Sequence, residues 1–378
     1  MKCIWKIPVT ALQLILLLGF SISSSLASDP NNITARQDRA KLKVTIDPRA
    51  ELMGVIFHLA GNPEYNNCKS KSYIRNLNEH FAGHRNHPAV KMAIKLRKTR
   101  GVSFDAVMGL AVHIRDINSC SEIVHFEPRP DTLDPRWQIN EAREFLADCR
   151  DFVKETDFKA FLTKNQPQYE TATARLQQLI DTKANISWFD EFFGPRDDVD
   201  FNLVLSILNG PGNYGCRVKL DGRTKIYSII GAWRVDWLGW GYPTFDPGVL
   251  STVVHEFSHS YCNPLVDKYM KGFSPFGEKY FPRVEKQMKR QAYANWHTMM
   301  RESLVRACEV RYAMANDGQE RAEQIANYNI GRGFYWINEL SELLGQYEKQ
   351  RDKYQTLDAF MPKIVEFFQN YDGPPESS

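Results

Sequence analysis

The sequence has little net charge of either sign. It contains 48 Lys and Arg residues against 45 Asp and Glu residues, which gives a net charge of +3 when His is neutral. No basic run with interleaved aromatic residues is present, so we expect no nucleic-acid partner. Internal repeats and low-complexity tracts are also lacking, and 43% of the 378 residues are hydrophobic. These absences exclude a repetitive or disordered chain and predict a globular one with a sizeable core.

Long hydrophobic runs are lacking outside the N-terminal region. There, residues 11–20 (ALQLILLLGF) form an apolar stretch that follows Lys2 and Lys6 and precedes small residues up to Ala27. The pattern predicts a secretory signal, residues 1–27, cleaved after Ala27, and an uncleaved anchor is the alternative. The stretch is too short for a convincing membrane span. We therefore expect an exported protein, periplasmic or extracellular, with no stable membrane span after cleavage.

Cysteine is sparse. Besides Cys3, which lies in the predicted signal, the sequence contains Cys68, Cys120, Cys149, Cys216, Cys262 and Cys308. Export would permit disulfides, but six cysteines allow 15 pairings and none of these spacings is diagnostic. The sequence therefore assigns no pair.

The pattern of hydrophobic residues predicts an α+β fold that is mainly helical. In residues 42–59, apolar and polar residues first alternate and an apolar run then follows, which predicts one or two strands. Helical spacing dominates from about residue 87 to residue 164, and again from Pro247 onward. Between these regions lie β-rich runs bounded by Gly, Asn, Pro and Asp, at residues 200–210, 216–222 and 224–237. They predict a small antiparallel sheet.

Residues 246–264 (DPGVLSTVVHEFSHSYCNP) have the features of one helix. Asp246 suits the N-cap, and Pro247 suits the first helical position, where its missing N–H is not needed. Asn263 predicts the end, because a residue before proline, here Pro264, is pushed out of the α region. Apolar residues recur at helical spacing and predict the buried face: Leu250, Val253, Val254, Phe257 and Tyr261.

This helix contains the pattern HExxH. His255 and His259 are four residues apart, so their imidazoles share one helix face and can reach one metal ion. Glu256 is rotated by about 100°, beside such a site rather than aimed at it, which suits a general base. Small residues in the preceding turns would leave open space in front of a metal: Gly248, Ser251 and Thr252. An ordinary amphipathic helix that happens to carry two histidines is the alternative.

A catalytic zinc site usually has three protein ligands, so a third residue is needed. No histidine follows His259 until His297. In residues 295–312 (NWHTMMRESLVRACEVRY), Glu302 lies on the flank of an apolar helical stripe. Glu302 would complete a His, His, Glu set from a second helix, which suits catalytic zinc.

Other assignments compete with Glu302 as the third ligand. Glu302 could instead form a surface ion pair with Arg306 at i, i+4, which would contribute only a few tenths of a kcal/mol. Glu309 lies on nearly the same face two turns later and is the second candidate ligand. Cys262 shares the histidine face and is a more distant third, with a structural role or a disulfide as its alternative.

A second group of histidines occurs at His80, His84 and His87 (NEHFAGHRNHP). On an unbroken helix their spacing would form another metal-binding face. Gly83 weakens that helix and Pro88 ends it, so a solvated loop is favoured.

The segment VVHEFSHSYCNP followed by RESLVRA resembles the gluzincin type of zinc metallopeptidase. It resembles more closely an exported bacterial family, domain of unknown function 4932. The resemblance extends to DPRAELMGVIFHLAG, HPAVKMA and YEKQRDKYQTLDAFMPKIVEFF, and so covers about residues 40–370. It implies a zincin-like fold with a small sheet beside the HExxH helix. It also implies one zinc ion per chain, bound by His255, His259 and Glu302, with Glu256 as general base.

These features together lead us to expect an exported zinc metallopeptidase that acts on a peptide or protein. Water activated by zinc and Glu256 would attack a peptide carbonyl, which also needs a donor for the developing oxyanion. Four candidates are left open for that donor: Arg306, Tyr312, Tyr261 and His297. By resemblance, residues 224–237 would be the strand beside the cleft. The glycine-rich segment 209–216 would be either one rim of the cleft or only a turn.

Two alternatives remain open for the function. One is a catalytically silent binding protein on a zincin scaffold, and the other is a zinc hydrolase of non-peptide amide bonds. The intact Glu256 favours an enzyme, because a purely structural metal site has no need of that carboxylate. We expect residues 28–378 to form a single zincin-like domain that can divide into two lobes. These would be a mainly helical lobe at about residues 40–190 and a metal-binding lobe at residues 191–378.

Overall fold

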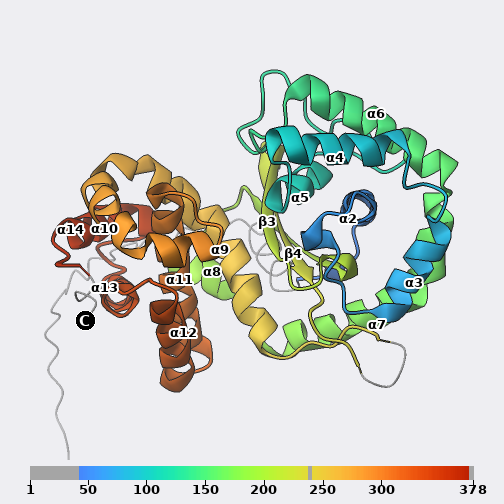
Figure 1. Ribbon diagram of the computed structural model, residues 1–378. Coiled ribbons are helices and arrows are strands. Elements are labelled where there is room, and N and C mark those ends of the chain that lie inside the picture. The colour runs from blue at the N-terminus through green and yellow to red at the C-terminus, as the bar shows by residue number, and fades with distance from the viewer. Residues whose placement is uncertain (1–41, 237–240, 374–378) are drawn as a thin grey trace, which may run out of the picture.

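The computed structural model describes residues 42–236 and 241–373, so the predicted signal at residues 1–27 lies outside the described residues. Within these ranges the chain forms thirteen α-helices and one four-stranded sheet (Figure 1). The prediction of a mainly helical α+β fold with a small sheet is therefore confirmed. No helix in the described part combines the length and the apolar character that crossing a membrane requires.

The four strands lie in the order β1 (Val44–Thr45), β2 (Val199–Ser206), β4 (Arg223–Gly231) and β3 (Tyr214–Leu220). β1 and β4 each run parallel to β2, and only β3 runs antiparallel to its neighbour, β4. The prediction of an antiparallel sheet was therefore wrong for all but this hairpin. The β3–β4 turn is a two-residue Asp221-Gly222 turn in which both residues have positive φ, 51° and 75°, and such short turns join antiparallel strands. The parallel pairs arise through longer connections that strand patterns alone do not reveal.

The N-terminal apolar run forms a helix rather than the second predicted strand. β1 has only two residues, and α2 (Pro48–Leu59) follows at once. Asp47 caps this helix by accepting a hydrogen bond from the N–H of Arg49, and Pro48 occupies the first helical position. α2 is buried from Ala50 to Leu59. A helix buried on all sides carries no amphipathic period, which explains why its sequence resembles a strand.

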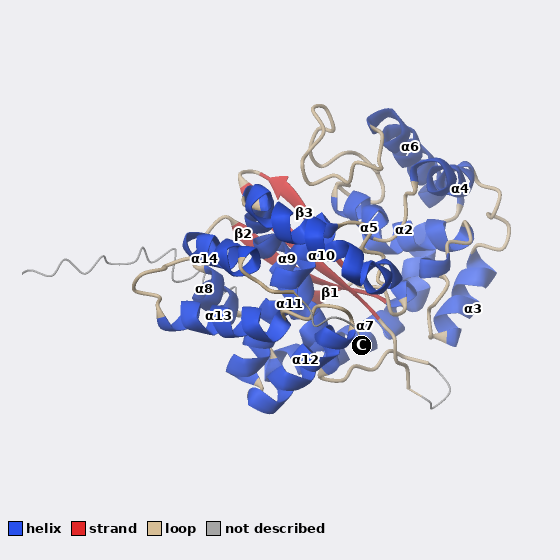
Figure 2. Ribbon diagram, turned by 60° about the vertical axis from the view of Figure 1, so that its left-hand side comes forward, coloured by secondary structure: helices blue, strands red, loops and turns tan. Residues whose placement is uncertain are grey.

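Helices cover both sides of the sheet (Figures 1 and 2). On the α2 side lie α3 (Lys71–His80), α4 (Pro88–Arg100), α5 (Asp105–Val112), α6 (Ile139–Glu155) and α7 (Phe158–Lys183). On the other side lie α8 (Ser187–Phe193), α9 (Gly248–Lys268), α10 (Met270–Arg290), α11 (Trp296–Asn316), α12 (Gln319–Gly331), α13 (Ile337–Lys349) and α14 (Leu357–Gln369). Two 3-10 turns, η1 (Pro63–Tyr65) and η2 (Ile207–Asn209), complete the described elements. The buried apolar side chains form one connected cluster.

The helix that contains HExxH, α9, packs on β3 and β4 and against α11. α9 begins at Gly248 with Pro247 as its N-cap residue, one position later than predicted. Asp246 still accepts a hydrogen bond from the N–H of Gly248 (2.7 Å) and so satisfies a free donor at the helix start. The predicted end was wrong, because α9 continues past Pro264 to Lys268. Pro264 cannot donate to the carbonyl of Ser260, which costs one helical hydrogen bond. The turn beyond it still buries Val266, which is 1% exposed, and this burial favours continuation of the helix.

Candidate metal centre

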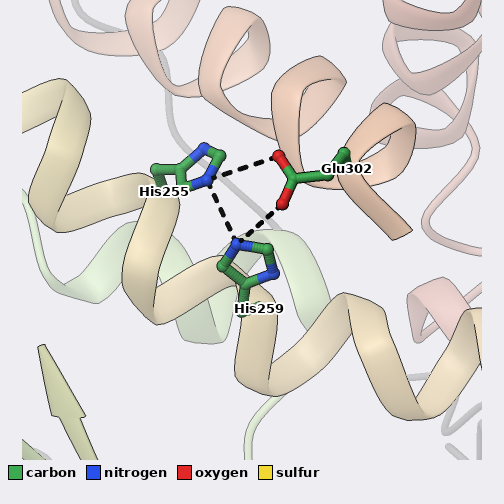
Figure 3. A group of neighbouring side chains, drawn as sticks. All are labelled: His255, His259 and Glu302. Atoms are coloured by element: carbon green, nitrogen blue, oxygen red, sulfur yellow. Dashed lines mark hydrogen bonds and ion pairs between the residues drawn. The ribbon is translucent and has the colours of Figure 1, made fainter. Parts of the chain in front are cut away.

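Two helices bring three side chains together. α9 supplies His255 and His259, and α11 supplies Glu302, whose carboxylate faces both imidazole rings (Figure 3). The two Nε2 atoms are 3.1 Å apart. Glu302 Oε2 lies 3.6 Å from Nε2 of His255, and Glu302 Oε1 lies 3.5 Å from Nε2 of His259. Among the residues described, this is the group of His, Cys, Asp and Glu side chains that could hold a metal ion.

The spacing of these atoms matches a tetrahedral ion. Two ligand atoms that are each about 2.0–2.1 Å from a tetrahedral zinc lie roughly 3.4 Å apart. The two Nε2 atoms are 3.1 Å apart, and each lies 3.5–3.6 Å from a different oxygen of Glu302, so these separations are close to that value. A common centre therefore needs only small side-chain adjustments, and the donor set of two imidazoles and one carboxylate suits zinc with one open position.

Glu309 fixes the proton on the outer nitrogen of His255. Its Oε2 lies 3.2 Å from Nδ1 of that ring. An ionised carboxylate can only accept, so Nδ1 donates and Nε2 presents its lone pair to the site in the neutral ring. Glu309 was the second candidate ligand, and the structure instead places it behind the ligand ring. Burial lowers the pKa of His255, but the charge and hydrogen bond of Glu309 outweigh burial, so the pKa is raised.

Asn263 supports the other ring in the same way. Its Oδ1 lies 3.2 Å from Nδ1 of His259, so this nitrogen donates and Nε2 again faces the site with its lone pair. The two lone pairs then lie 3.1 Å apart, and each nitrogen lies within 3.6 Å of one oxygen of the Glu302 carboxylate. Such an arrangement is repulsive unless a cation or an extra proton lies between the groups.

Glu302 is held from behind by two donors. Tyr293 donates its hydroxyl proton to Glu302 Oε2 (2.8 Å), and Arg306 Nη2 donates to the same oxygen (2.9 Å). Glu302 is 6% exposed and Arg306 is 3% exposed, so their pair is buried and is not the surface ion pair weighed above. Burial would raise the pKa of Glu302, but Arg306 and the two histidines outweigh burial and lower the pKa to about 2. The carboxylate is therefore ionised, as a metal ligand must be.

Arg306 and Tyr312, two of the candidate oxyanion donors, already have other partners. Arg306 bonds Glu302 and Tyr293, and its Nη1 donates to Oδ1 of Asn329 (2.7 Å). The hydroxyl of Tyr312 accepts a hydrogen bond from the N–H of Asn185 (2.8 Å).

The other two candidate donors lie in different surroundings. The ring of Tyr261 stacks on Phe193, with centroids 4.4 Å apart. His297 is exposed, and its ring contacts Trp296.

The side chain of Glu256 extends from α9 toward the edge strand β3. Its side chain is 9% exposed, and burial raises its pKa despite the opposing effect of the two histidines. A Cβ atom on Gly215 of β3 would lie 2.9 Å from Glu256 Oε2, so only glycine lets the strand approach this closely. Gly215 is nevertheless exposed. The backbone of β3 is therefore open to solvent directly beside the Glu256 carboxylate.

The strand beside this carboxylate is not the expected one. Residues 224–237 overlap β4 (Arg223–Gly231), which is an inner strand with β2 and β3 on its two sides. β3 is one of the two edge strands of the described sheet, and it begins within the glycine-rich segment 209–216. That segment therefore continues into the strand next to Glu256.

A cavity of about 280 Å³ adjoins the candidate centre on the Glu309 side. It is lined by Lys183, Pro247, Leu250, Ser251, Val254, Glu309, Tyr312, Ala313, Asp317 and Arg321. Of the small residues expected to leave space, Ser251 lines this cavity. Gly248 instead accommodates the capping carboxylate, because a Cβ there would lie 2.7 Å from Asp246 Oδ1.

The remaining sequence candidates lie away from the three ligand atoms. Cys262 Sγ is 3.8 Å from Cys308 Sγ, both side chains are buried, and the described cysteines are free thiols.

The second histidine group forms no single face. His80 ends α3 and bonds the carbonyl of Thr156 (2.7 Å), and His84 lies in the loop that follows. His87 accepts from the N–H of Ala89 as the N-cap of α4 (3.1 Å). The segment is thus broken as predicted, but His87 is buried rather than solvated.

Sequence reasoning missed three residues of the site. Tyr293 lies in the turn before α11, where no periodicity points to a contact with Glu302. Gly215 lies in the glycine-rich segment expected to be a rim of the cleft or only a turn, but nothing in its flanks predicts the contact with Glu256. Asn263 could have been found, because it follows His259 by four residues on the same helix face.

The fold and the site define a mainly helical α+β protein with a candidate His, His, Glu metal centre between two helices. The chain belongs to the family described as Domain of unknown function (DUF4932), whose profile matches residues 42–367. Searches of curated proteins and of solved structures each find no match.

Proposed function

We propose that this protein is an exported, zinc-dependent metallopeptidase of the gluzincin type with a zincin-like fold. The observation that carries the proposal is the convergence of His255, His259 and Glu302, with both Nε2 lone pairs aimed at one point. Zinc, when bound there, supplies a Lewis acid that polarises a carbonyl and lowers the pKa of water toward about 7.

Glu256 is the general base in this proposal. It follows the ligand His255 directly, and its carboxylate is buried beside the exposed backbone of Gly215. Its raised pKa brings it closer to the value at which a carboxylate can accept and then return a proton near neutral pH. Glu256 takes the proton of the attacking water and passes it to the leaving amine.

The edge strand β3 favours a peptide substrate over other amides. Among the described strands, β3 pairs with β4 on one side only. The free N–H and C=O groups of an edge strand can bind an extended peptide by adding it to the sheet. Gly215 leaves that edge open at the point nearest Glu256. The scissile carbonyl of such a peptide would lie beside the general base.

Metal content tests the proposal first. The mature protein, purified without a histidine tag, is expected to contain about one zinc per chain by elemental analysis. Absence of bound metal, even after zinc is supplied and the excess removed, would mean that the HExxH pattern occurs on this helix by chance. A binding protein on the same scaffold would then explain the chain better.

Substitution of Glu256 tests the chemistry. Glu256→Gln is expected to keep zinc and to lose nearly all turnover of a peptide library, because the amide cannot accept the proton. Glu342→Gln on α13, an exposed position, serves as the control and should keep full activity. Unchanged turnover in Glu256→Gln would exclude the general-base role.

A further inference from the structure

The side chains of β3 alternate between two different surroundings. Cys216 faces α5, where its Sγ lies 4.0 Å from the carbonyl oxygen of Asp105. Gly215 presents its Cβ position to Glu256 on α9. Because alternate residues of a strand point to the same face, Arg217 leaves β3 on the face of Gly215. Arg217 therefore extends toward α9, on the side that carries the candidate site.

Within the described part of the chain, the guanidinium of Arg217 has no carboxylate partner. The side chain is half-buried, yet its guanidinium makes no hydrogen bond or ion pair with any residue in the described ranges. Burial lowers the pKa of Arg217, and Asp131 and Asp267 oppose this effect only in part. A partly desolvated guanidinium without a partner is unfavourable, so such groups are usually paired.

The other charges around Arg217 are already paired. Asp131 binds Lys219 (2.8 Å), and Asp267 on α9 binds Arg301 on α11 (2.7 Å). Nearby Arg196 binds Asp198 (2.7 Å). Four cationic side chains therefore share three carboxylates, and Arg217 is the one left over within this described group. Gly215, two residues before Arg217 on β3, lies against Glu256, which relates the surplus charge to the candidate site.

We propose that Arg217 binds a carboxylate of the substrate and thereby makes this protein a peptidase selective for acidic peptides. The proposal rests on the peptidase function argued above. Arg217 provides two parallel N–H donors that match a carboxylate bidentately, and the bound anion supplies the partner that the protein lacks.

The position of Arg217 limits where that carboxylate lies. Arg217 is two residues from Gly215, which corresponds to about 6.5–7 Å along a strand. A peptide added to the edge of β3 would therefore place its carboxylate about two residues from the bond held at Glu256. An acidic side chain or the C-terminal carboxylate of a short product segment can each supply the anion at that distance.

Matched peptides separate these two sources. Both peptides of the first pair are blocked at both ends. One member carries Glu, and the other carries Gln, at every position within three residues of the cleaved bond. The second pair contains no acidic side chain and ends in either a free carboxylate or an amide. We expect zinc-loaded wild-type protein to prefer the carboxylate member of at least one pair by tenfold or more in kcat/KM.

Variants of β3 then assign the preference to Arg217. Arg217→Gln should remove the preference mainly by lowering kcat/KM for the acidic peptide. Arg217→Glu should reverse it in favour of a Lys-containing peptide of the same length. Lys219→Gln is the matched control, because Lys219 is the next residue on the same strand face and already pairs with Asp131. It should leave the preference unchanged.

The outcomes distinguish this proposal from the peptidase function itself. Cleavage of both members of each pair at equal rates, or a preference that survives Arg217→Gln, would overturn the role of Arg217 and leave the peptidase function standing. Failure of zinc-loaded wild-type protein to cleave any peptide would overturn both. Retained zinc content and an unchanged melting temperature in Arg217→Gln verify that the variant is folded, so that a lost preference reports on substrate binding.

Discussion

Four groups act on the carboxylate of Glu302. Two imidazoles approach it from the site, and Tyr293 and Arg306 hold Oε2 from behind. Tyr293 and Arg306 both bond Oε2, so Oε1 faces His259 and is turned toward the site. The buried position of Arg306 makes this arrangement a structural unit as well as a candidate metal site.

Removing the carboxylate should therefore affect both metal binding and stability. Glu302→Ala is expected to abolish stoichiometric zinc binding and to lower the free energy of unfolding by about 3–5 kcal/mol, because it leaves the buried guanidinium of Arg306 without its bonded carboxylate. The double variant Glu302→Ala with Arg306→Met should recover much of the stability but none of the metal. Chemical denaturation and elemental analysis measure the two effects separately. Full zinc retention in Glu302→Ala would show that the third ligand is misassigned.

Glu309 offers a second prediction at the scale of single residues. Because Glu309 orients His255 without facing the metal position, Glu309→Gln should weaken zinc affinity by about 10–100-fold rather than abolish it. Competition with a chromophoric chelator measures this change, with Glu342→Gln as the exposed control. If Glu309→Gln lost zinc completely while Glu302→Ala kept it, Glu309 would be the ligand.

At the scale of elements, the site depends on how closely β3 approaches α9. The sequence of α9 predicts its start and its histidine face, because capping and helical spacing are local. Its continuation past Pro264 was not predictable in the same way, since it depends on the burial of Val266 against other elements. The pairing of β3 is likewise a long-range property. Local patterns predicted strands here but gave neither their order nor the edge position of β3.

Gly215→Ala tests this close approach. The added Cβ would meet Oε2 of Glu256 at 2.9 Å and the Glu256 carbonyl oxygen at 3.1 Å, so the carboxylate or the strand must shift. We expect kcat to fall by about 10–100-fold with zinc content unchanged, because small misplacements of a catalytic group are costly. Gly109→Ala in α5 is the control, since nothing lies within 4 Å of a Cβ there. Equal activity in both variants would mean that β3 does not position Glu256.

At the scale of the whole molecule, a buried carboxyl far from the candidate centre joins distant parts of the chain. Glu51 on α2 is 0% exposed. It accepts hydrogen bonds from Tyr73 on α3, Tyr169 on α7 and Ser206 at the end of β2. This network connects residues that are up to 155 positions apart in the sequence. The sequence showed only an apolar run at this point, so neither α2 nor its buried acid was predictable from local patterns.

The pKa of Glu51 makes the stability of the fold depend on pH. Burial raises this pKa above its ordinary value of 4.5, the three hydroxyl donors offset burial only in part, and the charge of Asp47 raises it further. A carboxyl whose pKa is raised by folding contributes fully to stability below its unfolded pKa, and that contribution is lost as the pH rises through its folded pKa. Glu51→Gln cannot ionise, so it should melt several degrees above wild type at pH 8 and at nearly the same temperature at pH 4. Melting curves from pH 4 to pH 8, with Glu342→Gln as the exposed control, measure this difference. A constant difference in melting temperature between Glu51→Gln and wild type across this range would mean that folding does not shift the ionisation of Glu51. The network would then act through its hydrogen bonds alone.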